Sequence, residues 1–395
     1  MIVYADMGRW TRPGLTGIWP GRVPDASAPL TVMLRRDLRA AKGSRMKRPT
    51  IADIAQLAGV TKAAVSFALN GQPGVSAATR ERILAIAQEV GFQPNSAARA
   101  LTAGKADALG LVIDRPARTL GIEPFFMQLV SGIQAELSEH QVTLLFTVTE
   151  DTDAEIALYR RWWQQRRVDG VFVVDLQVDD RRIAVLEELR MPAVVIGTPR
   201  GSGSLPAVWQ DDRARVEVVV GYLAGQGHRR IARVGGRSQY WHSVLRREAF
   251  ASVAEIAGLD AVSVEADYSA EHGAAATVGL LGSAEPPTAI LYDSDVMAAA
   301  GLGVAQRMGF SVPDRLSIVS WDDSALCELM HPALTALRGD IAATGSAAAR
   351  ILRELAAGGQ PESVAEAPPE LQVRMSSGPA VVPVLPATGR SRLTA

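Results

Sequence analysis

The pattern of apolar and polar positions changes along the chain, and it begins as that of short helices. Between residues 50 and 91, apolar residues recur every three to four positions, the period of a helix with one buried face. Ile51, Ile54 and Ala58 would share such a face, and Gly59-Val60 would break the helix. This segment is therefore predicted to begin a small helical domain.

Two further helices are predicted in the same segment. Thr61 can cap a helix over residues 62–69, because its hydroxyl can accept a hydrogen bond from a free backbone N–H of the first turn. Ser76 can cap a third helix, which Gly91 would end. We expect four residues of this third helix to point inward: Ile83, Leu84, Ala87 and Val90.

From Ala108 onward the pattern is typical of a parallel α/β fold. Continuous apolar runs of β type alternate with amphipathic helical stretches, as in strands that are covered on both faces. About four runs precede the segment 201–204 and four follow it, so two doubly wound lobes fit better than one eight-stranded sheet. The predicted strands are 108–113, 142–148, 170–174, 193–196, 231–234, 262–264, 289–292 and 316–320.

These patterns predict five parts in the 395 residues. Residues 1–45 have no sustained period and are predicted to be disordered. Met46 begins the sequence afresh, so this extension is interpreted either as a misplaced start or as a real basic tail. The other parts are a helix-turn-helix domain (46–94), a hinge helix and linker (95–105), a two-lobed ligand-binding and dimerisation core (106–378) and a flexible tail (379–395).

The charge of the chain is unevenly distributed, although its net value is only −1. Residues 1–45 contain eight Lys and Arg residues against three acids, and residues 46–105 contain seven against three. A basic N-terminal portion on an acidic body indicates a nucleic-acid partner, although a solvated charged surface would give the same count. The single cysteine, Cys327, excludes an internal disulfide. With no secretory apolar segment and no apolar run of about 20 residues, we expect a cytoplasmic, nucleoid-associated protein without a membrane partner.

Residues 50–71 meet the physical requirements of a helix-turn-helix. Ala55 is small enough for two helices to cross closely, and Gly59 tolerates the positive φ of the turn. Val60, Val65 and Leu69 would fix the second helix against the first. The exposed face of this second helix would lie in the major groove of double-stranded DNA, and its candidates are Thr61, Lys62, Ala63, Ser66 and Phe67.

From about Met46 to Gly378, the chain resembles the lactose/galactose repressor (LacI/GalR) family of bacterial regulators. The residues that carry the resemblance are the helix-turn-helix, the segment 92–101 and the α/β body that follows. The resemblance implies base contacts from Lys62 and Ala63 and a base or phosphate contact from Ser66. It also implies that Leu101 wedges into the minor groove. The remaining residues assigned to DNA are Thr50, Thr61, Asn70, Thr79, Asn95 and Ala98.

One position departs from the family pattern. Phe67 stands where many members carry an arginine directed at guanine, and a phenylalanine cannot make that bidentate contact. Its ring would either touch a thymine methyl group or belong to the core of the domain. Leu101 has a similar alternative, which is ordinary helix packing. The operator sequence therefore does not carry over from better-known relatives.

The resemblance also assigns a ligand site to loops that follow the strands of the core. Carboxyl ends of strands are where doubly wound sheets bind ligands, and a sugar calls for bidentate polar groups and flat aromatic rings. The candidates are Asp114, Phe125, Phe126, Arg246, Tyr268, Asp293, Ser294, Trp321 and Asp322. Some have a structural alternative: Arg246 as a surface arginine, Trp321 as core and Asp295 as a helix cap. The basic loop 114–119 also leaves an anionic or phosphorylated ligand open.

Together these observations predict a homodimeric, sequence-specific transcription regulator, interpreted as a repressor. A small-molecule effector, expected to be a sugar or a related metabolite, would control it by closing the lobes and so changing the order of the hinge helix. One rival is a solute-binding protein without a DNA role, and another is an enzyme. The sequence contains no Gly-rich phosphate loop, no G-x-S-x-G motif and no metal-spaced His/Cys cluster, so we expect no catalytic residue and no cofactor.

Overall fold

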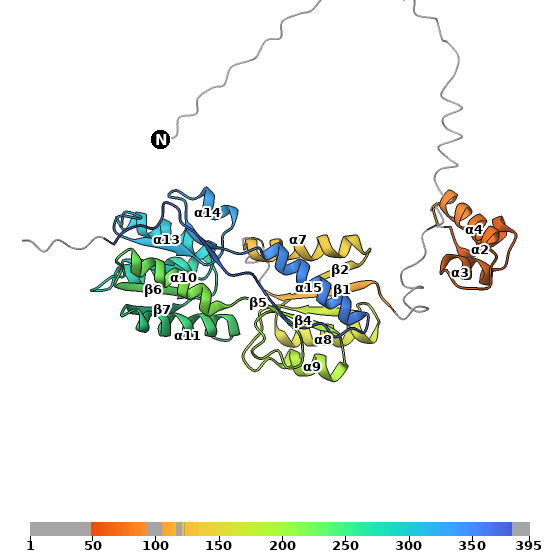
Figure 1. The fold of residues 1–395 in the computed structure, drawn as a ribbon, viewed down its shortest axis with the longest axis horizontal. Helices are drawn as coiled ribbons and strands as arrows, with labels where there is room; N and C mark the ends of the chain where they lie inside the picture. Colours follow the sequence, from red (N-terminus) through yellow and green to blue (C-terminus); the bar gives the residue numbers. More distant parts are fainter. Residues whose placement is uncertain (1–48, 93–104, 116–120, 122, 381–395) are drawn as a thin grey trace, which may run out of the picture. The chain divides into compact units, whose positions relative to one another are not determined.

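The computed structural model describes residues 49–92, 105–115, 121 and 123–380, which fall into two compact units divided between Pro94 and Asn95 (Figure 1). The predicted N-terminal extension and hinge helix, with Asn95, Ala98 and Leu101, lie outside the described residues. The predicted tail does so from residue 381 onward. The core extends to Ala380, whose backbone N–H donates to the carbonyl of Gln226.

The first unit is a three-helix domain built from α2 (Ile51–Ala58), α3 (Lys62–Leu69) and α4 (Ala77–Glu89). Helices α2 and α3 meet at 104°, within the range of helix-turn-helix pairs. Gly59 makes the turn with a φ of 63°, in the left-handed region that favours glycine. The predicted caps are present, because Thr61 and Ser76 each accept a hydrogen bond from a backbone N–H three residues later.

The inward face of α4 differs from the prediction at one residue. Ile83 and Ala87 are buried and Val90 is partly buried, as expected. Leu84 is 45% exposed, so its assignment to the core was wrong. The next residue along a helix lies about 100° around the axis, which turns Leu84 away from the narrow face that Ile83 and Ala87 occupy.

The N-terminal lobe of the second unit is a six-stranded sheet covered by helices on both faces (Figure 1). Its strand order is β11-β5-β4-β3-β1-β2, and every strand pair is parallel. Helices α7 (Pro124–Glu139) and α15 (Ile341–Ala356) pack on one face, and α8 (Thr152–Gln164) and α9 (Arg181–Leu189) on the other. The strands are β1 (Ala108–Asp114), β2 (Thr143–Thr149), β3 (Gly170–Val173), β4 (Ala193–Gly197), β5 (Ala207–Trp209) and β11 (Val364–Ala365).

The C-terminal lobe repeats this plan. Its strand order is β12-β10-β9-β8-β6-β7, parallel except for the antiparallel pair β10–β12. Helices α10 (Asp212–Gly225) and α11 (Trp241–Ile256) cover one face, and α12 (Ala270–Leu281) and α13 (Asp295–Arg307) the other. The lobe also contains β6 (Arg230–Gly235), β7 (Asp260–Glu265), β8 (Ala289–Tyr292), β9 (Ser317–Ser320), β10 (Thr335–Arg338), β12 (Glu370–Gln372) and α14 (Ala325–Leu329).

The chain passes between the two lobes three times. It crosses after β5, returns after β10 to form α15, and crosses again between β11 and β12. The N-terminal lobe thus contains two elements that come late in the chain, α15 and β11. The eight predicted strands are all present, with ends that differ by at most two residues. The short strands β5, β10, β11 and β12 were not predicted.

Helices α7 and α15 touch through glycines. A Cβ atom added to Gly132 would lie 1.9 Å from the carbonyl oxygen of Ala342, and one added to Gly345 would lie 2.4 Å from that of Leu129. Side chains larger than hydrogen are therefore excluded at the contact, and the two helix backbones approach closely. Among the described residues, no single helix has the length and apolarity to cross a membrane, and only the bent pair α2–α3 passes that test jointly, by length and composition.

Candidate DNA-binding surface and ligand cavity

The residues predicted to contact DNA lie along the outer face of α3. Lys62, Ala63 and Phe67 are exposed, and Asn70 follows at the end of the helix. Ser66 is half-buried and accepts a hydrogen bond from the side-chain amide of Asn70 at 3.4 Å. The opposite face of α3 contributes Val65 and Ala68 to the core, as expected for a helix with one buried stripe.

Phe67 is not a core residue, so that alternative for its role is excluded. Its side chain is 39% exposed, and its ring lies over the loop at Gly74, where an added Cβ would come within 3.3 Å of it. A large apolar side chain in this position is unusual unless it meets a partner. The structure thus leaves the ring available for contact with another molecule.

Two threonines at the edges of this surface are already engaged in helix capping. Thr50 forms a capping box with Asp53, and its hydroxyl donates to the Asp53 carboxylate at 2.7 Å. Thr79 is half-buried, and its backbone N–H donates to the Ser76 hydroxyl.

Arg80 was not predicted to have a structural role. Its guanidinium donates to the carbonyls of Phe67 and Ala68 at 3.1 and 3.0 Å. These hydrogen bonds fix the carboxyl end of α3.

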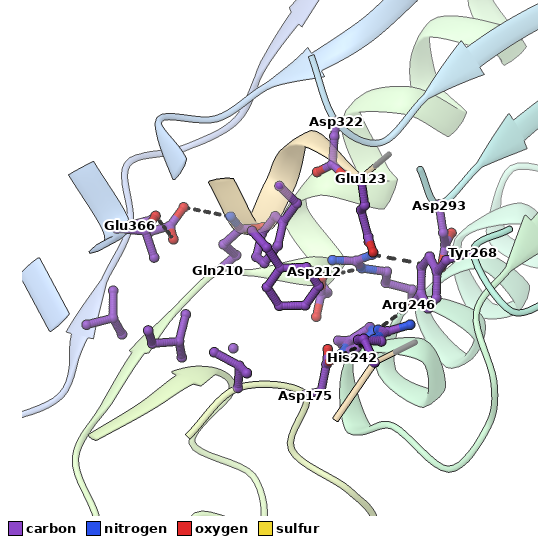
Figure 2. A pocket seen from close by; sticks show the side chains of 18 residues that line it. Glu123, Asp175, Gln210, Asp212, His242, Arg246, Tyr268, Asp293, Asp322 and Glu366 are labelled. Carbon is purple, nitrogen blue, oxygen red and sulfur yellow. Dashed lines mark hydrogen bonds and ion pairs between the residues drawn. The ribbon is translucent and has the colours of Figure 1, made fainter. Parts of the chain in front are cut away.

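A cavity lies between the two lobes, at the carboxyl ends of their strands (Figure 2). The space that no protein atom fills is about 770 Å³, which includes volume open to solvent. Both lobes and the segments that cross between them contribute to its lining. The lining residues are Arg115, Glu123, Phe125, Phe126, Val174, Asp175, Ile196, Gly197, Val208, Gln210, Asp212, His242, Arg246, Tyr268, Asp293, Asp322, Thr344 and Glu366.

Six of the nine predicted ligand residues line this cavity: Phe125, Phe126, Arg246, Tyr268, Asp293 and Asp322. The other three, Asp114, Ser294 and Trp321, do not. Asp114 ends β1 outside the lining. Trp321 is fully buried in the C-terminal core, as its structural alternative proposed, and its ring centroid lies 4.1 Å from the guanidinium carbon of Arg246. It therefore supports a lining residue from behind.

The cap of α13 that the sequence suggested for Asp295 is made by its neighbour Ser294. Ser294 is buried and caps α13, accepting a hydrogen bond from the backbone N–H of Met297 at 3.3 Å. Asp295 is the first residue of that helix rather than its cap, and its carboxylate accepts a hydrogen bond from the Ser324 hydroxyl. A serine beside the helix start satisfies a free N–H more readily than it reaches a ligand.

Arg246 is the main cation of the C-terminal lobe in the cavity, and it is not a surface arginine. Its Nε donates to Asp212 at 3.0 Å, and its Nη1 lies 3.9 Å from the carboxylate of Asp293. Burial would lower the pKa of Arg246, but Asp212 and Asp293 outweigh it and raise the pKa further. Asp293 is also paired with the buried Arg233. The guanidinium is thus permanently charged and held in a fixed orientation.

Arg115 plays a corresponding part in the N-terminal lobe. Its Nε donates to Asp175 at 2.9 Å. Its guanidinium carbon lies 5.1 and 5.0 Å from the ring centroids of Tyr240 and Tyr268, which belong to the other lobe. Burial would raise the pKa of Asp175, but the charge of Arg115 dominates and lowers it. The ion pair therefore orients Arg115 within the N-terminal lobe, and its cation–π contacts join the two lobes at the cavity.

Two carboxylates in the cavity have no such cation. Glu123 is 9% exposed, and its buried Oε2 has no hydrogen-bond partner. Burial raises the pKa of Glu123 to about 8, and nearby carboxylates add to this effect. Burial, together with Asp295, likewise raises the pKa of Asp322 to about 7. Both groups are polar, desolvated and available to a ligand.

His242 is a neutral polar group in the same cavity. Its ring stacks on Tyr240 with a centroid separation of 5.5 Å, and its Nε2 lies 2.7 Å from the hydroxyl of Tyr268. Burial, reinforced by Arg246, lowers the pKa of His242 to about 3. Tyr268 is held from a second side by the Ser243 hydroxyl at 3.0 Å. The aromatic wall of the cavity is therefore fixed by internal hydrogen bonds.

Several lining residues were not predicted, and they form two groups by their place in the fold. Arg115, Glu123 and Asp175 follow or precede elements of the N-terminal lobe. Gln210, Asp212, Thr344 and Glu366 lie in or beside the segments that cross between the lobes. Two signals for them were present in the sequence: Asp175 directly follows a predicted strand, 170–174, and Arg115 lies in the basic loop 114–119.

The fold and the two sites define a class of protein: a DNA-binding transcription regulator with a helix-turn-helix headpiece and a two-lobed effector domain. Residues 50–95 match the sequence profile described as bacterial regulatory proteins, lacI family, and residues 220–377 match that of the periplasmic binding protein-like domain. The HTH-type transcriptional regulator CelR of Thermobifida fusca is 31% identical over 325 residues, which cover 81% of this chain and 95% of CelR.

Solved structures agree with this class. A LacI family transcriptional regulator from Bifidobacterium animalis subsp. lactis is 35% identical, with a TM-score of 0.66 over 70% of this chain and 100% of that one. The complex of CelR with cellobiose is 30% identical, with a TM-score of 0.64 over 84% of this chain and 100% of that one.

The chain belongs to the lacI family of bacterial regulatory proteins. It is therefore a DNA-binding transcriptional regulator under the control of a small-molecule effector, and the family is not one of enzymes. The alternative of a solute-binding protein without a DNA role is not supported, because the headpiece matches the family's DNA-binding domain.

Proposed function

We propose that this regulator is a homodimeric repressor whose effector is a carbohydrate bound in the cavity between the lobes. The observation that carries the proposal is the lining of that cavity, where aromatic rings stand beside fixed guanidinium and carboxylate groups. Sugars offer apolar ring faces together with many hydroxyl groups, and such a lining matches both. The cellobiose complex of the relative CelR supports the same class of ligand.

Most of the predicted ligand residues receive a role in this proposal. Phe126 and Tyr268 pack against the faces of a sugar ring, and Phe125 extends this apolar surface. Arg246 donates in a bidentate manner to ring hydroxyls, while Asp293 and Asp322 accept hydrogen bonds from them. Ser294 and Trp321 act indirectly, through the α13 cap and through packing behind Arg246. Asp114 lies outside the lining, so the proposal assigns it no direct contact with the ligand.

The headpiece is proposed to read its operator through the outer face of α3. Lys62, Ala63 and Phe67 would contact base edges, with the Phe67 ring against a thymine methyl group. The neighbouring polar residues would bind phosphates or hold the helix in register: Thr50, Thr61, Ser66, Asn70 and Thr79. Asn95, Ala98 and Leu101 are proposed to enter the minor groove, so the protein would act on chromosomal DNA in the nucleoid.

The proposed control is a shift between two populations. A ligand between the lobes changes their separation, which changes the distance between the two hinge segments of a dimer. The effector can alter DNA affinity only through its different affinities for the two states, typically by about 1–3 kcal/mol. We propose that the effector releases the operator.

A mobility-shift titration tests both halves of this proposal. The purified protein is titrated against DNA from upstream of its own gene, at constant salt, with and without a panel of mono- and disaccharides. We expect a specific complex that one sugar weakens at least fivefold. Lys62→Ala should weaken the complex at least tenfold, whereas Leu84→Ala, on the exposed side of α4, should leave it unchanged. A protein that ignores double-stranded DNA at low salt, or that no sugar affects, contradicts the proposal.

A further inference from the structure

The lining of the cavity contains more carboxylates than cations. Among the residues that the structure describes, its six acidic residues are Glu123, Asp175, Asp212, Asp293, Asp322 and Glu366, against the two arginines Arg115 and Arg246. His242 does not change this balance, because its lowered pKa leaves the ring neutral. A neutral sugar site needs no such excess of negative charge, so the excess calls for an explanation.

The cations of the cavity are already committed within the protein. Arg115 is paired with Asp175, and Arg246 with Asp212, at 2.9 and 3.0 Å. Asp293 has the buried Arg233 behind it. Glu366 accepts hydrogen bonds from Gln210 and Thr344. Four of the six carboxylates therefore have partners, and no guanidinium in the lining remains unpaired for the other two.

Those two are Glu123 and Asp322. Glu123 directly precedes α7, is more than nine-tenths buried, and has one carboxylate oxygen without any partner. The side chain of Asp322 forms no hydrogen bond or ion pair with the described residues. Both side chains line the same cavity (Figure 2), and the charge of Asp322 contributes to the raised pKa of Glu123. The fold thus places two carboxylates without an ion-pair partner among the described residues in one cavity.

We propose that the effector is an amino sugar whose ammonium group binds Glu123 and Asp322, an inference that rests on the proposed carbohydrate function. An ammonium group has three N–H donors and one positive charge, which matches two carboxylates that form no hydrogen bond or ion pair with the described residues and feel arginine charges only from a distance. A hydroxyl in the same place would donate one hydrogen bond and leave the buried charge uncompensated. A phosphorylated sugar would bring further negative charge to an acidic wall.

The protonation of the two carboxylates agrees with this arrangement. With pKa values of about 8 and about 7, Glu123 and Asp322 are partly protonated near neutral pH. A bound ammonium group favours their ionised forms and lowers both values. Binding of an amino sugar should therefore release protons, whereas binding of a neutral sugar should release few.

Isothermal titration calorimetry on the full chain tests the proposal with matched ligands. The probes are glucosamine, glucose and N-acetylglucosamine, the corresponding galactose series, the β-1,4-linked disaccharides of glucosamine and glucose, and glucose 6-phosphate. We expect at least one amine to bind tenfold or more tightly than its hydroxyl and N-acetyl counterparts. Titrations in buffers of different ionisation enthalpy at pH 7.5 should show proton release for that amine.

Isosteric variants connect the effect to the two carboxylates. Glu123→Gln should weaken binding of the amine at least tenfold, while binding of its neutral counterpart changes by less than threefold. Asp322→Asn also removes an acceptor for sugar hydroxyls, so it should weaken both ligands, with a loss for the amine at least tenfold larger than the loss for its neutral counterpart. Glu139→Gln, at the exposed end of the same helix α7, is the matched control and should change neither. Thermal unfolding of each variant verifies the fold, which the amides should preserve because they relieve repulsion.

The outcomes separate this inference from the proposed function. If a neutral or phosphorylated sugar binds as tightly as the matched amine, the amino-sugar assignment is wrong and the carbohydrate function stands. The same holds if amine binding survives both Glu123→Gln and Asp322→Asn. If no sugar of any kind binds, both proposals fail together.

Discussion

At the scale of single residues, the polar groups of the cavity fall into two sets. One set is satisfied within the protein, as Arg246 is by Asp212, and forms a rigid frame. The other set, the buried Glu123 and the half-buried Asp322, forms no ion pair with the described residues. Groups of the first kind contribute to the stability of the fold, whereas groups of the second kind reduce it in exchange for binding.

The pH dependence of stability should reveal Glu123. Its pKa of about 8 in the folded chain is above the unfolded value near 4.5, so the folded state binds more protons between these pH values. The contribution of Glu123 to the free energy of unfolding therefore falls as the pH rises from about 5 to 8. We expect Glu123→Gln to gain stability over the wild type more strongly at pH 8 than at pH 6. Denaturant unfolding of both proteins at the two pH values measures the difference, and a gain that does not depend on pH would contradict it.

Arg246 should be costly to remove alone and less costly with its partner. Arg246→Met leaves Asp212 buried without its cation, which typically costs about 3–5 kcal/mol. Asp212→Asn in the same chain removes the stranded charge and should recover a substantial part of that loss. Urea unfolding of the two single variants and the double variant gives the coupling energy, and strictly additive effects would argue against a functional pair.

The sequence predicted residues of the site mainly through the resemblance to the family. Phe126, Arg246, Tyr268 and Asp293 were assigned in this way, and they line the cavity. Ser294 was predicted to bind ligand but does not line the cavity, because its hydroxyl accepts a hydrogen bond from a free N–H at the start of α13. Glu123 and Glu366 are far apart in the chain and line one cavity only in the folded protein, which no local pattern records.

At the scale of elements, the contact between α7 and α15 depends on two glycines with no space for a side chain. Gly345→Ala should destabilise the N-terminal lobe by about 1–3 kcal/mol, because the added Cβ meets the backbone of Leu129. Gly221→Ala, on the exposed side of α10 with open space around it, is the control and should stabilise by about 0.5–1 kcal/mol. Thermal unfolding compares the two, and a harmless Gly345→Ala would mean that the helices separate easily.

The two faces of α3 should respond differently to truncation. Val65→Ala removes fully buried methyl groups and should lower headpiece stability by about 1–3 kcal/mol. Phe67→Ala removes an exposed ring and should change stability by no more than about 0.5 kcal/mol while altering operator preference. Circular dichroism melts and selection of binding sites from a random DNA library measure the two effects. An unchanged preference would remove Phe67 from the reading surface.

The predictability of elements followed their length. Runs such as 108–113 and 289–292 were recognised because their apolar residues are continuous and buried on both faces. Strands β5, β10, β11 and β12 have two to four residues each, too few to establish a period. Their pairing is set by neighbouring strands, which is a tertiary effect.

At the scale of the whole effector domain, the lobes touch beside the cavity as well as through their three connections. The backbone N–H of Trp241 donates to Leu176 at 2.9 Å, and that of Val178 donates to Gln239 at 2.8 Å. Arg115 adds its contacts with Tyr240 and Tyr268. The domain in this structure is therefore held closed by direct contacts between the lobes.

Removing Arg115 should favour a more open domain. Arg115→Ala deletes the cation–π contacts that join the lobes, together with the ion pair to Asp175 that orients Arg115, so the radius of gyration should increase and the affinity for the effector should fall at least tenfold. Small-angle X-ray scattering of the wild type and the variant, each with and without the effector, measures the change. Arg160→Ala, an exposed arginine of α8, is the control. Identical scattering curves would mean that Arg115 does not contribute to closure.

The late entry of α15 and β11 into the N-terminal lobe has a consequence for biosynthesis. A ribosome that has translated the first five strands of this lobe has not yet made the helix that covers half of one face, since α15 begins only at Ile341. The headpiece is complete by Glu89 and can fold as it emerges, but the effector domain must wait for almost the entire polypeptide. A nascent or prematurely terminated chain would thus carry a folded headpiece attached to an effector domain that has not folded.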